Sequence, residues 1–191
     1  GHLVLLAKDN QGYKNLMKIV SIGFTEGFYY KPRIDYEVLE QYSEGLIALS
    51  ACLSGDVPKA LMKNDFELAK KVAHRYNDIF GKGNFYLELQ SNGIEEQKLV
   101  NSQLVKLSKE TGIPLVATND AHYLRKEDAR AHEILLCIQT GKNINDEDRM
   151  RFSTEDFYVK SPDEMAEVFA NIPEAIENTV MIGKMCNVEL E

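Results

Sequence analysis

The side chains in this sequence best suited to chemistry are metal-ligand types that follow apolar segments. Asp120 and His122 follow one apolar run, Cys52 follows another, and His2 adds one of only four imidazoles in the chain. Side chains alternate between the two faces of an extended chain, so Asp120 and His122 project to the same side. A carboxylate, an imidazole and a thiol from separate strand ends suit a transition metal better than calcium or magnesium.

Each of these residues also has an ordinary structural interpretation. Asp120 could cap a helix beside a partly exposed His122, and Cys52 could be a small buried apolar residue. An Asp-x-His pair alone is a weak signal, whereas ligand types on several strand ends are more informative. We therefore interpret His2, Cys52, Asp120 and His122 as candidate metal ligands.

The composition indicates a globular chain rather than a membrane or disulfide-rich one. Its 191 residues are 44% apolar and 27% charged, enough for one well-buried domain. No apolar run approaches the ~20 residues that span a bilayer, and no signal peptide is visible, so we expect a cytoplasmic protein without membrane contact. Three widely spaced cysteines argue against a disulfide framework. The net charge of −8 argues against a surface that coats duplex DNA, so any nucleic-acid contact should be local.

The order of the predicted elements favours a parallel sheet. We predict strands at 3–7, 46–50, 85–89 and 114–118. We predict helices at 12–22, 36–41, 65–80, 94–111 and 128–140, a helix ending at 61, and two helices opening at Pro162 and Pro173. Strands separated by helices are typical of βα units, whose binding sites gather at the carboxyl ends of the strands. Cys52, Asp120 and His122 fall there, whereas His2 precedes its strand and would need a bend or bulge.

A second candidate site is the aromatic and basic cluster at residues 28–33. Tyr30, Lys31 and Arg33 could stack on and clamp a single DNA strand, since aromatic rings interleaved with cations do so in other proteins. The alternative is a loop that packs its rings against the sheet. We favour that packed alternative from the sequence alone.

Several segments of the sequence resemble a known family. Residues 2–13, 44–55, 85–90, 116–124 and 172–180 are similar to the alpha subunits of bacterial DNA polymerase III. The similar part is the later portion of their polymerase-and-histidinol-phosphatase (PHP) domain, and it covers essentially the whole chain. The resemblance implies an α/β fold, with the later strands of a distorted seven-stranded β/α barrel followed by C-terminal helices. It also implies that His2, Cys52, Asp120 and His122 belong to a metal cleft.

The resemblance further implies a division of the chain and a set of partners. Residues 1–145 would be a truncated PHP domain, and residues 146–191 a helical exit segment toward the polymerase core. The family's His-x-His, Asp-His and Glu motifs and its palm carboxylates have no counterpart here, and the apolar start indicates a domain lacking its upstream part. We therefore expect a piece of a replicative polymerase that does not itself polymerise DNA.

The expected cofactor and partners follow from that interpretation. Zinc or manganese would occupy the intact domain, which could act as a 3′→5′ nuclease, and would be weakly held or absent here. The whole protein would bind DNA, deoxynucleotides and a proofreading exonuclease subunit. Unpaired strand edges predict self-association of the chain alone. A free-standing metal-dependent phosphoesterase and a docking module for the exonuclease subunit remain alternatives.

Overall fold

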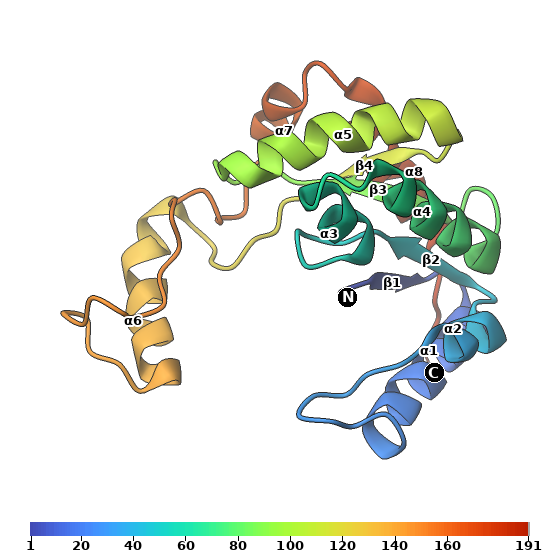
Figure 1. The fold of residues 1–191 in the computed structure, drawn as a ribbon, viewed down its shortest axis with the longest axis horizontal. Helices are drawn as coiled ribbons and strands as arrows, with labels where there is room; N and C mark the ends of the chain where they lie inside the picture. The colour runs from blue at the N-terminus through green and yellow to red at the C-terminus, as the bar shows by residue number, and fades with distance from the viewer. Residues whose placement is uncertain (191) are drawn as a thin grey trace.

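A four-stranded sheet forms the centre of the computed structural model, which describes residues 1–190 (Figure 1). Its strands lie side by side in chain order: β1 (Val4–Ala7), β2 (Leu46–Leu49), β3 (Phe85–Leu89) and β4 (Leu115–Ala117). The last three strands run parallel, but β1 pairs antiparallel with β2. The prediction of an all-parallel sheet is therefore wrong for β1.

The helices lie close to their predicted positions. In chain order they are α1 (Asn10–Thr25), α2 (Tyr36–Tyr42), α3 (Asp56–Met62), α4 (Phe66–Phe80), α5 (Glu95–Thr111), α6 (Ala129–Thr140), α7 (Pro162–Val168) and α8 (Pro173–Met185), with a short 3-10 turn at Lys126–Asp128. Between β1 and β2 the chain passes back along the sheet in α1 and returns through α2. It therefore enters β2 at the end where β1 stops, which makes the pair antiparallel. Among residues 1–190, no helix is both long and apolar enough to cross a membrane.

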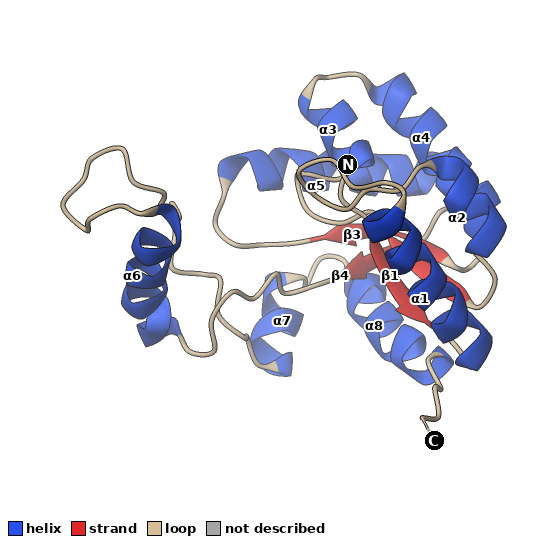
Figure 2. Cartoon of the chain, turned by 90° about the horizontal axis from the view of Figure 1, so that it is seen from below, coloured by secondary structure: helices blue, strands red, loops and turns tan. Residues whose placement is uncertain are grey.

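The alternation of side chains along β3 divides the core into two faces. Phe85, Leu87 and Leu89 are fully buried in the larger cluster, to which α1 to α5 contribute. Tyr86 points to the other face, where it packs in a smaller cluster with Ile182 of α8. The two layers of helices on either side of the sheet are visible in Figure 2.

Helix α8 belongs to the packing of the sheet. It lies against β4, and the Asn178 side-chain amide donates to the backbone oxygen of Leu115 at 2.7 Å. The Asn187 N–H donates to the Lys8 oxygen at 2.7 Å, so the chain beyond α8 reaches the end of β1. The division into a domain of residues 1–145 and a segment of residues 146–191 stays a prediction. Helix α8, which belongs to the second segment, nevertheless packs on the sheet formed by the first.

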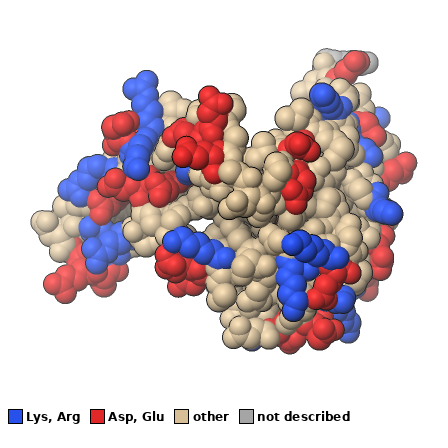
Figure 3. Space-filling model, turned by 90° about the horizontal axis from the view of Figure 1, so that it is seen from above, with Lys and Arg blue, Asp and Glu red and all other residues tan. Residues whose placement is uncertain are grey.

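Residues 123–160, here called the arm, extend away from the sheet and contain α6 (Figures 1 and 2). A parallel bridge between Tyr123 and Tyr158 joins the two ends of the arm. The His122 N–H donates to the Phe157 oxygen at 2.7 Å and fixes the base of the arm beside β4. On the face shown in Figure 3, acidic and basic side chains are interspersed over the arm, so this face presents no patch of one sign there.

Candidate functional site

The antiparallel direction of β1 places His2 at the end of the sheet where β2, β3 and β4 finish, here called the rim. The His2 N–H donates to the Ser54 oxygen at 3.0 Å, and His2 forms a parallel bridge with Gly55. Its Nδ1 lies 3.5 Å from the Cys52 Sγ. The expectation that His2 needs a bend or bulge to reach the site is therefore wrong, because the reversed strand delivers it directly.

A second pair of ligand-type residues follows β4. Asp120 Oδ1 and His122 Nε2 are 3.6 Å apart, so the prediction that their side chains share one side is confirmed. The Asn92 side-chain amide, which follows β3, donates to the other Asp120 oxygen at 3.0 Å. One Asp120 oxygen is thus held by an amide while the other faces the imidazole.

The chain leaves β2 and β4 at the rim through left-handed residues that are not glycine. Ala51 has φ 62° and Asp120 has φ 48°. Such a conformation costs on the order of 1–2 kcal/mol for a residue with a Cβ, and it is concentrated at functional sites. The strain redirects the chain immediately before Cys52 and at the Asp120 carboxylate itself.

Five polar residues, on β3 or just after β3 and β4, run from the sheet interior to the rim and are here called the polar ladder (Glu88, Gln90, Asn92, Thr118 and Asp120). Leu89 pairs with Ala117 in the parallel register, which sets Gln90 opposite Thr118 and Asn92 opposite Asp120. The Gln90 amide donates to both the Thr118 hydroxyl and Glu88 at 3.3 Å. The Thr118 hydroxyl in turn donates to Glu88 Oε1. Asn92 holds the Asp120 carboxylate at the rim, while Gln90, Thr118 and Glu88 form a separate hydrogen-bonded group further inside the sheet.

Glu88 is the innermost residue of the ladder and is only 4% exposed. Burial raises the pKa of its carboxyl group, and the nearby Asp120 charge acts in the same direction. Its Oε2 has no hydrogen-bond partner, nor has the buried Asn92 Oδ1. The sequence signal for this feature was the run of polar residues at alternate positions 88, 90 and 92, which begins inside the apolar strand β3 and continues past its end.

Three of the four predicted ligands line one cavity at the rim. Cys52, Asp120 and His122 surround a space of about 370 Å³ together with Asn92 and Arg151. Within residues 1–190, however, no three His, Cys, Asp or Glu side chains come close enough together to hold a metal ion. The site is two pairs of donors, His2 with Cys52 and Asp120 with His122, and as arranged they do not fit a complete metal centre.

An aromatic cluster joins the rim to the arm, and the sequence did not indicate it. The His122 ring contacts Phe152 and Phe157 edge-on, with centroids 4.9 and 5.3 Å apart. His132 of α6 packs on the same Phe152 at 4.9 Å and lies 6.0 Å from His122. Burial lowers the pKa of His132, and the neighbouring His122 adds to the effect. Phe152 and Phe157 lie in a stretch without regular periodicity, so no pattern placed them here.

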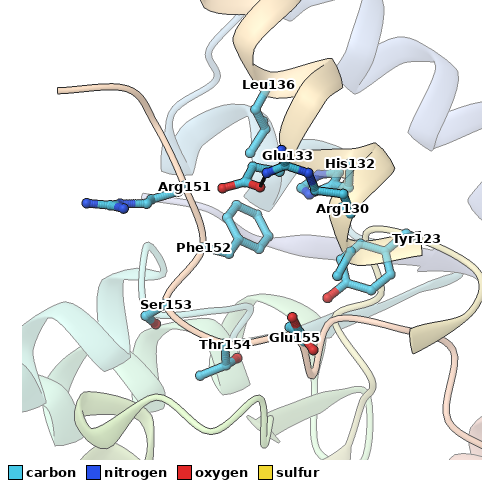
Figure 4. Close-up of a pocket in the computed structure, with 11 residues that line it drawn as sticks. Tyr123, Arg130, His132, Glu133, Leu136, Arg151, Phe152, Ser153, Thr154 and Glu155 are labelled. Carbon is cyan, nitrogen blue, oxygen red and sulfur yellow. Dashed lines mark hydrogen bonds and ion pairs between the residues drawn. The ribbon is translucent and has the colours of Figure 1, made fainter. Parts of the chain in front are cut away.

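The arm encloses a second cavity of about 250 Å³ beside this cluster (Figure 4). Figure 4 shows the rings of Phe152 and Tyr123 facing the same space, below Glu133 of α6. Glu133 is held by Arg130 at 2.6 Å and by Arg149 at 2.7 Å. These arginines lower the pKa of the Glu133 carboxyl group, with the hydrogen bond from Arg130 contributing most.

The structure places Tyr30, Lys31 and Arg33 in the loop between α1 and α2, with their side chains exposed. Tyr30 is 85% exposed and Tyr29 62% exposed. The packed alternative that the sequence favoured is therefore wrong for these two rings, because most of the surface of each is exposed to solvent.

Comparisons with known proteins show what the chain is similar to. Residues 1–92 match the PHP domain family. Relatives named DNA polymerase III subunit alpha are 52% identical in Borreliella burgdorferi, 47% in Treponema pallidum and 47% in Thermus aquaticus, over 97–99% of this chain. The chain spans 16% of the length of each of these relatives. These matches confirm the resemblance: the chain is similar, along nearly its whole length, to the PHP region of bacterial DNA polymerase III alpha subunits.

Proposed function

We propose that this chain is a piece of the alpha subunit of a bacterial replicative DNA polymerase, in which it supplies later elements of the PHP domain. The observation that carries the proposal is the 40–52% identity with alpha subunits over almost every residue of the chain. The open sheet would be part of a distorted barrel in the whole protein. The whole protein would bind DNA, deoxynucleotides and other replication subunits, including a proofreading exonuclease.

The proposed role is best tested in extracts of cells that make the protein. Antibodies against this chain should recognise a much longer polypeptide, and depletion with them should remove most primer extension on a long primed template. Pre-incubating the antibodies with purified chain serves as the matched control and should preserve the activity. Recognition of only the 21.7 kDa chain, with primer extension unchanged, would support a free-standing phosphoesterase instead.

We further propose that the chain alone holds zinc or manganese weakly or not at all and catalyses no reaction. A complete structural zinc site contributes ~10–16 kcal/mol of apparent binding energy, but here the donors form two pairs. After dialysis from excess zinc, metal analysis should give well below one zinc per chain. Replacing Cys52 with alanine should change this value no more than replacing Cys186. Stoichiometric zinc together with metal-dependent nuclease activity would contradict the proposal.

A further inference from the structure

The segment that forms α1 and the following loop differs in charge from the rest of the chain. Residues 10–34 contain Lys14, Lys18, Lys31 and Arg33 but only one acidic residue, Glu26, a net charge of +3. The whole chain has a net charge of −8. All four cations are exposed. The segment is therefore more basic than the rest of the chain, although Asp9 and Asp35 flank it directly, and it attracts a polyanion only over a short distance.

Exposed aromatic rings lie on the same surface. Phe24 and Phe28 stack with centroids 6.4 Å apart, and Tyr29 meets Tyr30 edge-on at 4.6 Å. More than half the surface of each of these four rings is exposed. Large rings are normally buried or paired with a partner, so a group of four exposed rings marks an interaction surface.

The loop holds its outermost ring in a defined position. Tyr29 and Lys31 form a bridge across a tight turn, with the Tyr29 N–H donating to the Lys31 oxygen at 3.1 Å. Tyr30 at the tip has φ 59°, a left-handed conformation that disfavours a residue with a side chain. The Arg33 guanidinium lies 4.7 Å from the centre of the Tyr29 ring and supports it from below the tip. The strain thus presents Tyr30 to solvent on a fixed turn.

The topology places this loop at the same end of the sheet as the rim. Helix α1 starts where β1 ends and runs back along it, so the C-terminal end of α1 lies near the start of β1. Leu3 and Ile34 line a common cavity, which confirms that the loop adjoins the first residues of the chain. The base of the loop therefore lies at the end of the sheet that also holds the His2 and Cys52 pair.

We propose that the loop at residues 28–33 binds single-stranded DNA, with Tyr30 as a stacking platform and Lys31 and Arg33 as phosphate contacts. Unpaired bases expose the faces that stack on aromatic side chains, and nearby cations follow the backbone. A duplex hides those faces and would bring more phosphates against an acidic protein. The choice of DNA over RNA rests on the proposed function; the presence of a stacking site does not.

Fluorescence anisotropy of a labelled oligothymidylate of about 20 nucleotides, titrated with the full chain at low salt, tests the proposal. Tyr30→Ala should weaken binding about fivefold or more, because one stacked base is lost, whereas Tyr30→Phe should retain it. Lys31→Ala should weaken binding and reduce the salt slope by about 0.7. Lys82→Ala, at the opposite end of the sheet, is the matched control and should have no effect. Circular dichroism should show every variant folded.

Four results would overturn the proposal. Equal affinity of the Tyr30→Ala and Tyr30→Phe variants would exclude stacking, and equal effects of Lys31→Ala and Lys82→Ala would exclude a local site. Duplex bound as tightly as the single strand would contradict recognition of exposed bases. Tighter binding of oligouridylate would contradict the assignment to DNA. None of these results alters the outcome of the antibody depletion, so the two proposals can fail separately.

Discussion

Replacing Glu88 with alanine is expected to lower the free energy of unfolding by about 3 kcal/mol. The carboxyl group accepts hydrogen bonds from the Thr118 hydroxyl and the Gln90 amide. Alanine would leave these donors buried without an acceptor, and each such donor costs about 1–3 kcal/mol unless water enters. Urea unfolding of the purified chain measures the loss.

Glu88→Gln is the informative companion, because it keeps an acceptor oxygen and removes the titration. Burial raises the pKa of Glu88 above its ordinary value of 4.5, so the unfolded chain ionises first as the pH rises. Protonated Glu88 stabilises the folded chain fully below pH 4.5. This stabilisation is lost as the pH rises through the raised pKa of Glu88 in the folded chain. The Glu88→Gln variant should therefore gain stability relative to the original chain as the pH rises above 4.5.

The control for this comparison is Glu96→Gln, at an exposed position on α5. It should leave the pH dependence of unfolding unchanged. Parallel pH profiles for the original chain and Glu88→Gln, or an alanine variant as stable as the original, would show that Glu88 is not the buried centre of the polar ladder.

The sequence predicted the strands well because each is a short apolar run between turn signals. It could not give the direction of β1, since alternating burial is the same for a strand read either way. The direction of β1 relative to β2 depends on how many times the chain between them runs along the length of the sheet, and here α1 and α2 make two such passes. The error mattered for the site, because it left His2 apparently on the wrong end of the sheet.

The packing of α8 was also beyond the sequence. Its apolar positions predict a buried side, but they do not say what buries it. In the structure Ile182 meets Tyr86 and Val116 on the second face of the sheet. A contact between segments so distant in the chain leaves no local pattern.

Within the candidate site, the sequence predicted contacts between residues that are close along the chain, but not contacts between distant segments. Asp120 and His122 are close in sequence and could be paired from it, although the chain there is not an extended strand, because Asp120 has φ 48°. The ladder partners Glu88 and Gln90 follow from the alternation of side chains along β3. The contact of His122 with Phe152 and His132 depends on how the arm folds back, which no local pattern encodes. The exposure of Tyr30 was missed because burial is the usual expectation for an aromatic ring.

The central structural claim is that the reversed β1 brings His2 beside Cys52, so that all four candidate ligands meet at one rim. A thiol introduced by His2→Cys, in a chain also carrying Cys137→Ala and Cys186→Ala, tests this directly. The present side-chain atoms of His2 and Cys52 are 3.5 Å apart. In a parallel arrangement, position 2 would lie beyond the far end of β2, separated from Cys52 by more than the length of that strand, about 13 Å, which is well beyond the reach of a disulfide.

Mild oxidation followed by tryptic peptide mass analysis is the decisive measurement. The account predicts a disulfide between position 2 and Cys52 in most molecules, and none in the matched Lys8→Cys chain, whose thiol sits past the opposite end of β1. Free thiols at both position 2 and Cys52 after oxidation, or a cross-link only from position 8, would contradict it.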